Sequence, residues 1–168
     1  MNDVEMVLNE SIGYGIELEP LTLGLPYARL QVRVTLVRDV LPSRLPRIRS
    51  AAEVYRDFAV LTALDREAFV VLLLDLKNRV TGVHVVSVGS LAASLVHPRE
   101  VFKTAILGNA AAVLVVHNHP SGDPTPSRED REITTRLKAS GELLGIPLID
   151  HIVVAEDGYR SFSEGGLL

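Results

Sequence analysis

Hydrophobic positions along the chain follow two periods, which predict strands and helices. Strict alternation over residues 28–37, with β-branched residues among them, predicts a half-buried strand. Short, mostly aliphatic runs predict further buried strands at 69–74, 80–88, 112–116 and 148–155. The polar residues 77–79 predict a turn between the first two of these runs.

Apolar residues spaced three and four positions apart predict three helices. The first begins at Ser50, where a Glu three residues later completes a capping-box pattern, and ends near Leu64. The second begins at Pro98, and the third begins at Ser127 and is terminated by Gly145. Strands that alternate with helices predict an α/β or α+β sandwich around a central sheet.

Composition narrows the class of protein. With 168 residues, of which 47% are hydrophobic and 5% aromatic, the chain is expected to form one domain with an aliphatic core, over residues 28–168, after an extension at 1–27. The absence of cysteine excludes disulfides, cysteine zinc sites and cysteine nucleophiles. No signal peptide and no membrane-spanning run are recognisable, so a cytoplasmic location without membrane contact is expected.

His117 and His119 directly follow the predicted strand at 112–116. In an extended chain, residues two apart point the same way, so both imidazoles are able to reach one ion. Two imidazoles suit zinc better than magnesium or calcium. Asp130, in the first turn of the helix that begins at Ser127, is the candidate third ligand, which would leave one position open for water. The alternative is an ordinary helix cap, because Ser127 with a first-turn acid also fits that role.

Residues 117–130 read HNHPSGDPTPSRED and resemble the metal motif H-x-H-x7-S-x-x-D of the JAMM (MPN+) metalloproteases. The resemblance is closer to the bacterial RadC family, whose form of this motif is HNHPSGDPxPSxxD. It covers about residues 28–168 and includes the segments around Glu67, 88–90, 98–102 and 148–151. It implies a central mixed sheet flanked by helices, in the MPN/JAMM (cytidine-deaminase-like) architecture. Longer RadC proteins also carry an amino-terminal helix-hairpin-helix region, which residues 1–27 do not resemble.

The resemblance also implies roles for individual residues. His117, His119 and Asp130 would bind Zn2+, and Ser127 would hydrogen-bond the reacting oxygen. In JAMM enzymes, a Glu just ahead of a core strand exchanges protons with the zinc-bound water and the leaving amine, and Glu67 has that position. Glu100 is the rival for this role.

Three functions follow as alternatives. The first is a zinc metallopeptidase or isopeptidase that acts on a protein or peptide. The second is a DNA-associated repair protein or nuclease, to which six arginines in residues 29–49 point, although a net charge of −4 and the interpretation of these arginines as a solvated face argue against it. The third is a metal-stabilised scaffold without catalysis. The sequence predicts neither the substrate nor the oligomeric state.

Overall fold

A five-stranded mixed sheet forms the centre of the part of the chain that the structure describes. The structure is a computed structural model, and it describes residues 46–89 and 96–168. The strand order is β2-β1-β3-β4-β5. These strands are β1 (Glu67–Leu74), β2 (Val80–Gly89), β3 (Ala112–Asn118), β4 (Leu148–Ala155) and β5 (Gly158–Ser161). β3 and β4 run parallel, whereas the other neighbouring pairs are antiparallel.

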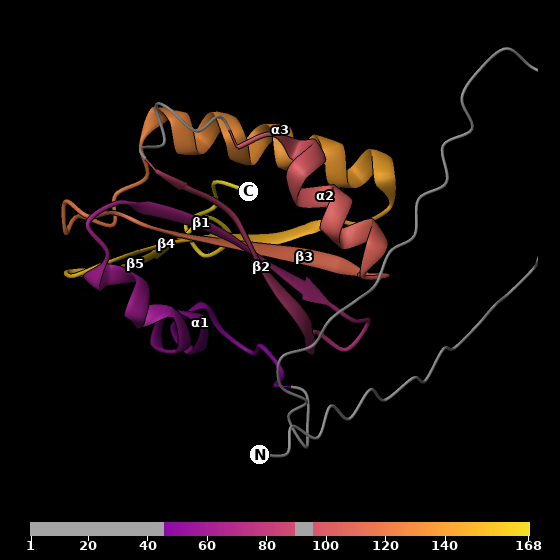
Figure 1. The fold of residues 1–168 in the computed structure, drawn as a ribbon, viewed down its shortest axis with the longest axis horizontal. Helices are drawn as coiled ribbons and strands as arrows, with labels where there is room; N and C mark the ends of the chain where they lie inside the picture. Colours follow the sequence, from indigo (N-terminus) through magenta and orange to yellow (C-terminus); the bar gives the residue numbers. More distant parts are fainter. Residues whose placement is uncertain (1–45, 90–95) are drawn as a thin grey trace, which may run out of the picture. The chain divides into compact units, whose positions relative to one another are not determined.

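Helices cover both faces of the sheet (Figure 1). On one face lies α1 (Ala51–Phe58), which continues as the 3-10 helix η1 (Ala59–Ala63). On the other face lie α2 (Pro98–Leu107) and α3 (Arg128–Leu144). The result is the predicted α+β sandwich. Among the helices of the described residues, none has the length and the apolar character needed to cross a bilayer.

The period of two along each strand divides the core into two layers. Phe69 and Val71 of β1 pack with the residues of α2 and α3, whereas Val70 and Leu72 pack with those of α1. Because both faces of the sheet are buried, the central strands are continuous aliphatic runs, which is why they were recognisable in the sequence. Glu67 has the same parity as Phe69 and therefore lies on the α2/α3 face.

Several predicted boundaries differ from the structure. β1 begins at Glu67 rather than at Phe69, and β3 continues through Asn118 rather than ending at Val116. The first helix is α-helical only to Phe58 and reaches Ala63 as a 3-10 helix. β5 was not predicted. The expected strand at 28–37 and the expected boundary after residue 27 lie outside the described residues.

Gly141 lets α3 pack closely against the segment that leads into β4. A Cβ at this position would lie 2.5 Å from the Ile146 carbonyl oxygen and 3.2 Å from the Phe102 ring. We therefore expect Gly141→Ala to lower the free energy of unfolding by about 1–3 kcal/mol, because the backbone must shift to relieve the overlap. The higher helix propensity of Ala acts in the opposite direction by about 1 kcal/mol. Urea denaturation measures the difference, and an unchanged or raised stability would contradict this account.

Candidate metal centre

Two histidines at the end of β3 approach each other on the α2/α3 face. His117 is fully buried between β1 and β4, where its ring stacks on Phe69 with ring centroids 5.9 Å apart. His119 lies just beyond the strand, and its backbone N–H donates to the Val154 carbonyl of β4. The Nε2 atoms of the two histidines are 3.0 Å apart. The extended backbone thus places both imidazoles at one point.

Asp130 reaches the same point from the first turn of α3. Ser127 is the N-cap of this helix, and its hydroxyl accepts the Asp130 N–H at 3.1 Å. In return, Asp130 Oδ2 accepts the backbone N–H and the hydroxyl of Ser127, both at 2.7 Å. This reciprocal capping box fixes the carboxylate. It leaves Asp130 Oδ1 3.1 Å from His117 Nε2 and Asp130 Oδ2 3.3 Å from His119 Nε2.

The three side chains fit a zinc ion. One ligand atom from each lies within 4.8 Å of the others. The Nε2 atoms of His117 and His119 are 3.0 Å apart and Asp130 Oδ1 lies 3.1 Å from His117 Nε2, which is close to the spacing of about 3.3 Å between tetrahedral ligands with bonds of about 2.0 Å. Asp130 Oδ1 is buried and has no hydrogen-bond partner among the described residues. A buried carboxylate oxygen without a donor is unfavourable, and a cation at this point would compensate it.

Hydrogen bonds on the far side of each imidazole fix which ring nitrogen faces this point. His119 Nδ1 lies 2.8 Å from the Asp123 carbonyl oxygen, which only accepts, so His119 carries its proton on Nδ1. Its Nε2 lone pair is then available when the ring is neutral. The loop that supplies Asp123 is held in turn by bonds from Thr125 N–H to Asp123 Oδ1 and from Gly122 N–H to the His119 carbonyl.

The orientation of His117 depends on a buried chain of hydrogen bonds. Thr134 donates its single hydroxyl proton to the Asp130 carbonyl at 2.6 Å, so it must accept from His151 Nδ1, also at 2.6 Å. His151 Nε2 therefore accepts from His117 Nδ1 at 2.8 Å. This order leaves the Nε2 lone pair of His117 for a metal. From the sequence, His151 fits either a buried structural residue or a support of the centre, and the structural role is the favoured interpretation; the hydrogen bond to His117 instead favours support of the centre.

We expect His151→Phe to weaken zinc binding by about 10- to 100-fold, because it removes the acceptor that orients His117. The Phe ring would keep the packing of His151 between Phe69 and Phe162. Phe162→Leu is the matched control, since the Phe162 ring stacks on His151 and its one hydrogen bond to His151, from its backbone N–H to the His151 carbonyl at 2.9 Å, is kept by Leu. A competition titration with a chelator measures the affinity of each folded variant. Equal zinc affinity in His151→Phe and the wild type would rule out the orienting role.

The titratable side chains at the centre shift one another's pKa values. Burial alone would raise the pKa of Asp130, but the close imidazoles of His117 and His119 hold that pKa well below its usual value. Burial opposes protonation of His119, yet Asp130, the Asp123 carbonyl and Glu67 together raise its pKa. Burial lowers the pKa of His151 well below its usual value, and the neighbouring His117 adds to this effect. His151 is therefore neutral where it contacts His117.

Asn118 positions Glu67 beside the centre. Its Oδ1 accepts the Ala68 N–H at 2.8 Å and its Nδ2 donates to the Arg66 carbonyl at 3.1 Å, so the side chain holds the residues on both sides of Glu67. At this end of the β1–β3 ladder, Phe69 pairs with His117. Continuing this antiparallel register by two residues places Glu67 across from His119. This role of Asn118 was not predicted from the sequence, although its place between the two histidines was a signal.

The other two candidate residues have different surroundings. The Ser127 hydroxyl is engaged with Asp130, as the ordinary cap requires, so its predicted bond to a reacting oxygen would need the hydroxyl to turn. Glu100 lies in the first turn of α2 and pairs with Lys103 at 2.6 Å and Arg99 at 3.3 Å. The structure therefore brings His117, His119, Asp130, Ser127 and Glu67 together.

One strand ends in two histidines that converge on one point, and the first turn of a neighbouring helix supplies an acid to the same point. These features define a JAB-type α+β domain with a candidate metal centre. A family model described as a RadC-like JAB domain matches residues 48–167, and the chain belongs to that family.

Curated relatives agree with this assignment. A UPF0758 protein of Thermotoga maritima is 49% identical over 142 residues, which is 84% of this chain and 63% of the relative. A UPF0758 protein of Symbiobacterium thermophilum is 63% identical over 105 residues, which is 62% of this chain and 45% of the relative. The chain thus spans about half the length of the curated relatives it matches.

Proposed function

We propose that this chain is a zinc-dependent hydrolase of peptide or isopeptide bonds that acts on a protein or peptide in the cytoplasm. The main support is the buried Oδ1 atom of Asp130, which has no donor and lies 3.1 Å from His117 Nε2. Membership of the RadC-like JAB family supports a metal-dependent hydrolase in general. His117, His119 and Asp130 would hold the ion.

Zinc bound at such a site supplies a Lewis acid that polarises a carbonyl and activates water. Glu67, held across from His119, accepts a proton from the attacking water and delivers it to the amine nitrogen as the C–N bond breaks. The products are a carboxylic acid and an amine, so one water molecule is consumed per bond cleaved. The hydrogen bonds of Asn118 to both neighbours of Glu67 keep the carboxylate in place for these two transfers.

The surroundings of the two candidate acids favour Glu67 as the proton carrier. Lys103 and, less strongly, Arg99 lower the pKa of Glu100, which makes it a poor proton acceptor. Its ion pairs on the exposed side of α2 are those of a residue that compensates a helix terminus. Ser127 contributes by holding the Asp130 carboxylate, and its contact with the reacting oxygen remains a prediction.

The test is cleavage by the zinc-loaded chain, with elemental analysis of the same sample. We expect about one zinc ion per chain and hydrolysis of at least one member of a panel of peptides, isopeptide-linked proteins and folded proteins. Glu67→Gln is the inactive control. A fully zinc-loaded, folded sample that cleaves no amide bond in the panel would reject the proposal. A folded sample that binds no transition metal would reject it at an earlier step.

A further inference from the structure

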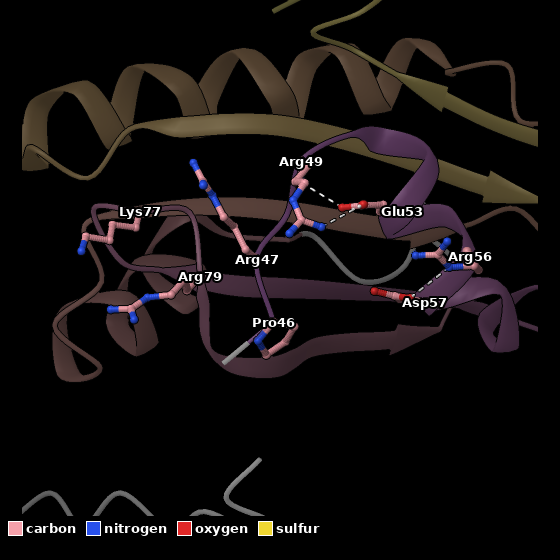
Figure 2. Close-up of a pocket in the computed structure, with 8 residues that line it drawn as sticks. All are labelled: Pro46, Arg47, Arg49, Glu53, Arg56, Asp57, Lys77 and Arg79. Carbon is pink, nitrogen blue, oxygen red and sulfur yellow. Dashed lines mark hydrogen bonds and ion pairs between the residues drawn. The ribbon is translucent and has the colours of Figure 1, made fainter. Parts of the chain in front are cut away.

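A hollow of about 550 Å³ lies between α1 and the turn that joins β1 to β2 (Figure 2). Five cationic side chains line it, against two acids, Glu53 and Asp57. The cations are Arg47, Arg49, Arg56, Lys77 and Arg79. The whole chain has a net charge of −4, so this positively charged hollow lies on a protein whose overall charge is negative.

The basic hollow is separate from the metal centre. β1 has 8 residues and runs from Glu67, beside His119, to Leu74, next to the turn that lines the hollow. At about 3.3 Å per residue, the two places are roughly 25 Å apart along the strand. The hollow therefore needs an explanation that does not depend on hydrolysis.

Two of its arginines are held directly opposite each other. Arg47 and Arg79 form an antiparallel bridge, flanked by bonds from Ile48 N–H to the Asn78 carbonyl at 3.0 Å and from Val80 N–H to the Pro46 carbonyl at 2.8 Å. This is the pattern of a non-hydrogen-bonded pair, in which opposite side chains approach most closely and share one face. Like charges at directly opposite positions are unfavourable, and the ion pair of Arg79 with Asp75 offsets only one of the two.

The turn that carries Lys77 and Arg79 has a fixed geometry. The Asp75 carboxylate accepts the backbone N–H groups of Lys77 and Arg79 and pairs with Arg79 Nε at 2.6 Å. Asn78 adopts a positive φ of 55°. Lys77 and Arg79 are two residues apart, and Figure 2 shows them on the same side of the hollow as Arg47. The cations are thus presented by a constrained backbone.

The acids in the hollow neutralise only part of this charge. Glu53 pairs with Arg49 and Asp57 with Arg56, each at 3.6 Å; Glu53 is half-buried and the other three residues are exposed, and ion pairs at such a surface contribute little. Arg47 and Lys77 have no ion pair within residues 46–89 and 96–168. A solvated face, which the sequence favoured for the arginines of residues 29–49, gives no reason to concentrate cations from two segments and to oppose two of them.

We propose that the basic hollow binds the phosphate groups of a duplex nucleic-acid backbone. Four of the five cations are arginines, whose planar guanidinium groups match phosphate oxygens. The residues that line the hollow include no aromatic side chain, so there is no platform on which bases of a single strand would stack. Contacts of this kind hold the backbone without reading sequence. Asp75 pairs with Arg79, so the bound phosphates would compensate mainly the charges of Arg47 and Lys77.

The test compares two double variants that remove the same charge. Arg47→Gln with Lys77→Gln neutralises the two unpaired cations of the hollow, whereas Arg136→Gln with Lys138→Gln neutralises two exposed residues of α3. Fluorescence anisotropy with a labelled DNA duplex of mixed sequence, repeated over a range of salt concentrations, measures binding by the full chain. We expect the first pair to weaken binding at least about tenfold and to reduce the salt slope by about 2, at about 0.9 for each lost contact. The control pair should leave binding close to that of the wild type.

Melting temperatures of the same proteins give a second measurement. Relief of like-charge repulsion should leave the Arg47→Gln, Lys77→Gln protein at least as stable as the wild type. The proposal is overturned by wild-type protein that does not bind duplex at low salt, by equal weakening in both double variants, or by a clearly lower melting temperature in the first. Binding of inorganic polyphosphate without binding of duplex would overturn it as well. None of these outcomes bears on amide hydrolysis.

Discussion

Glu67→Gln is expected to reduce kcat for amide cleavage by about 100- to 10,000-fold while the protein keeps its zinc. Gln has the size and shape of Glu, so the hydrogen bonds that Asn118 makes to the Arg66 carbonyl and the Ala68 N–H are retained. It cannot accept a proton, so the transfer from water to the leaving amine is lost. The loss should appear in kcat rather than in KM, because a proton carrier acts in the transition state.

Zinc content should be unchanged in this variant, since the three candidate ligand atoms belong to His117, His119 and Asp130. Glu100→Gln is the matched control, because it makes the same chemical change in the rival acid and should leave kcat near the wild-type value. Steady-state kinetics on a substrate found in the panel, with elemental analysis of each protein, distinguishes the two. An active Glu67→Gln enzyme beside an inactive Glu100→Gln enzyme would transfer the role to Glu100.

The sheet and its helices were largely predictable because both faces of the sheet are buried. Burial on two faces requires runs such as Phe69–Leu74, which are too short for helices and too apolar for loops. The ends of these strands were not predictable from hydrophobicity. Glu67, His117 and Asn118 are polar, yet they lie within the strands. They are at the strand ends that form the candidate metal centre, so the hydrophobic pattern stops before the strands do. β5 escaped prediction because its four residues, Gly158–Ser161, are stabilised by pairing with β4 rather than by their own pattern.

The candidate metal ligands were predictable from the sequence because they are close along the chain. His117 and His119 are two residues apart in an extended segment, and Asp130 follows at a helix start that Ser127 marks. The supporting residues were not accessible in this way. Asn118 acts on Arg66 and Ala68, about fifty residues earlier, and His151 acts on His117 from a different strand. Such contacts depend on strand order and register, which local patterns do not encode.

Asp130→Asn is expected to abolish zinc binding at physiological zinc levels while the fold is retained. The amide oxygen of Asn can accept the two hydrogen bonds that Ser127 now donates to Oδ2. Its NH2 group would then take the place of Oδ1, 3.1 Å from His117 Nε2. There it would donate a hydrogen bond to the lone pair that the chain from Thr134 through His151 leaves free for the metal. One substitution thus removes the anionic ligand and blocks a second ligand.

We therefore expect zinc affinity to fall by more than about 100-fold, which exceeds the effect of losing an outer partner such as His151. Asp150→Asn is the matched control, because Asp150 is also a buried acid but has donors at both oxygens, from Ser161, Ser163 and His151. Burial raises the pKa of Asp150, so a neutral side chain is tolerated there. Chelator competition measures zinc affinity, and thermal melting without zinc measures the fold. If Asp130→Asn and Asp150→Asn bound zinc equally well, the unpaired oxygen of Asp130 would not be a metal ligand, and the hydrolase proposal would lose its main support.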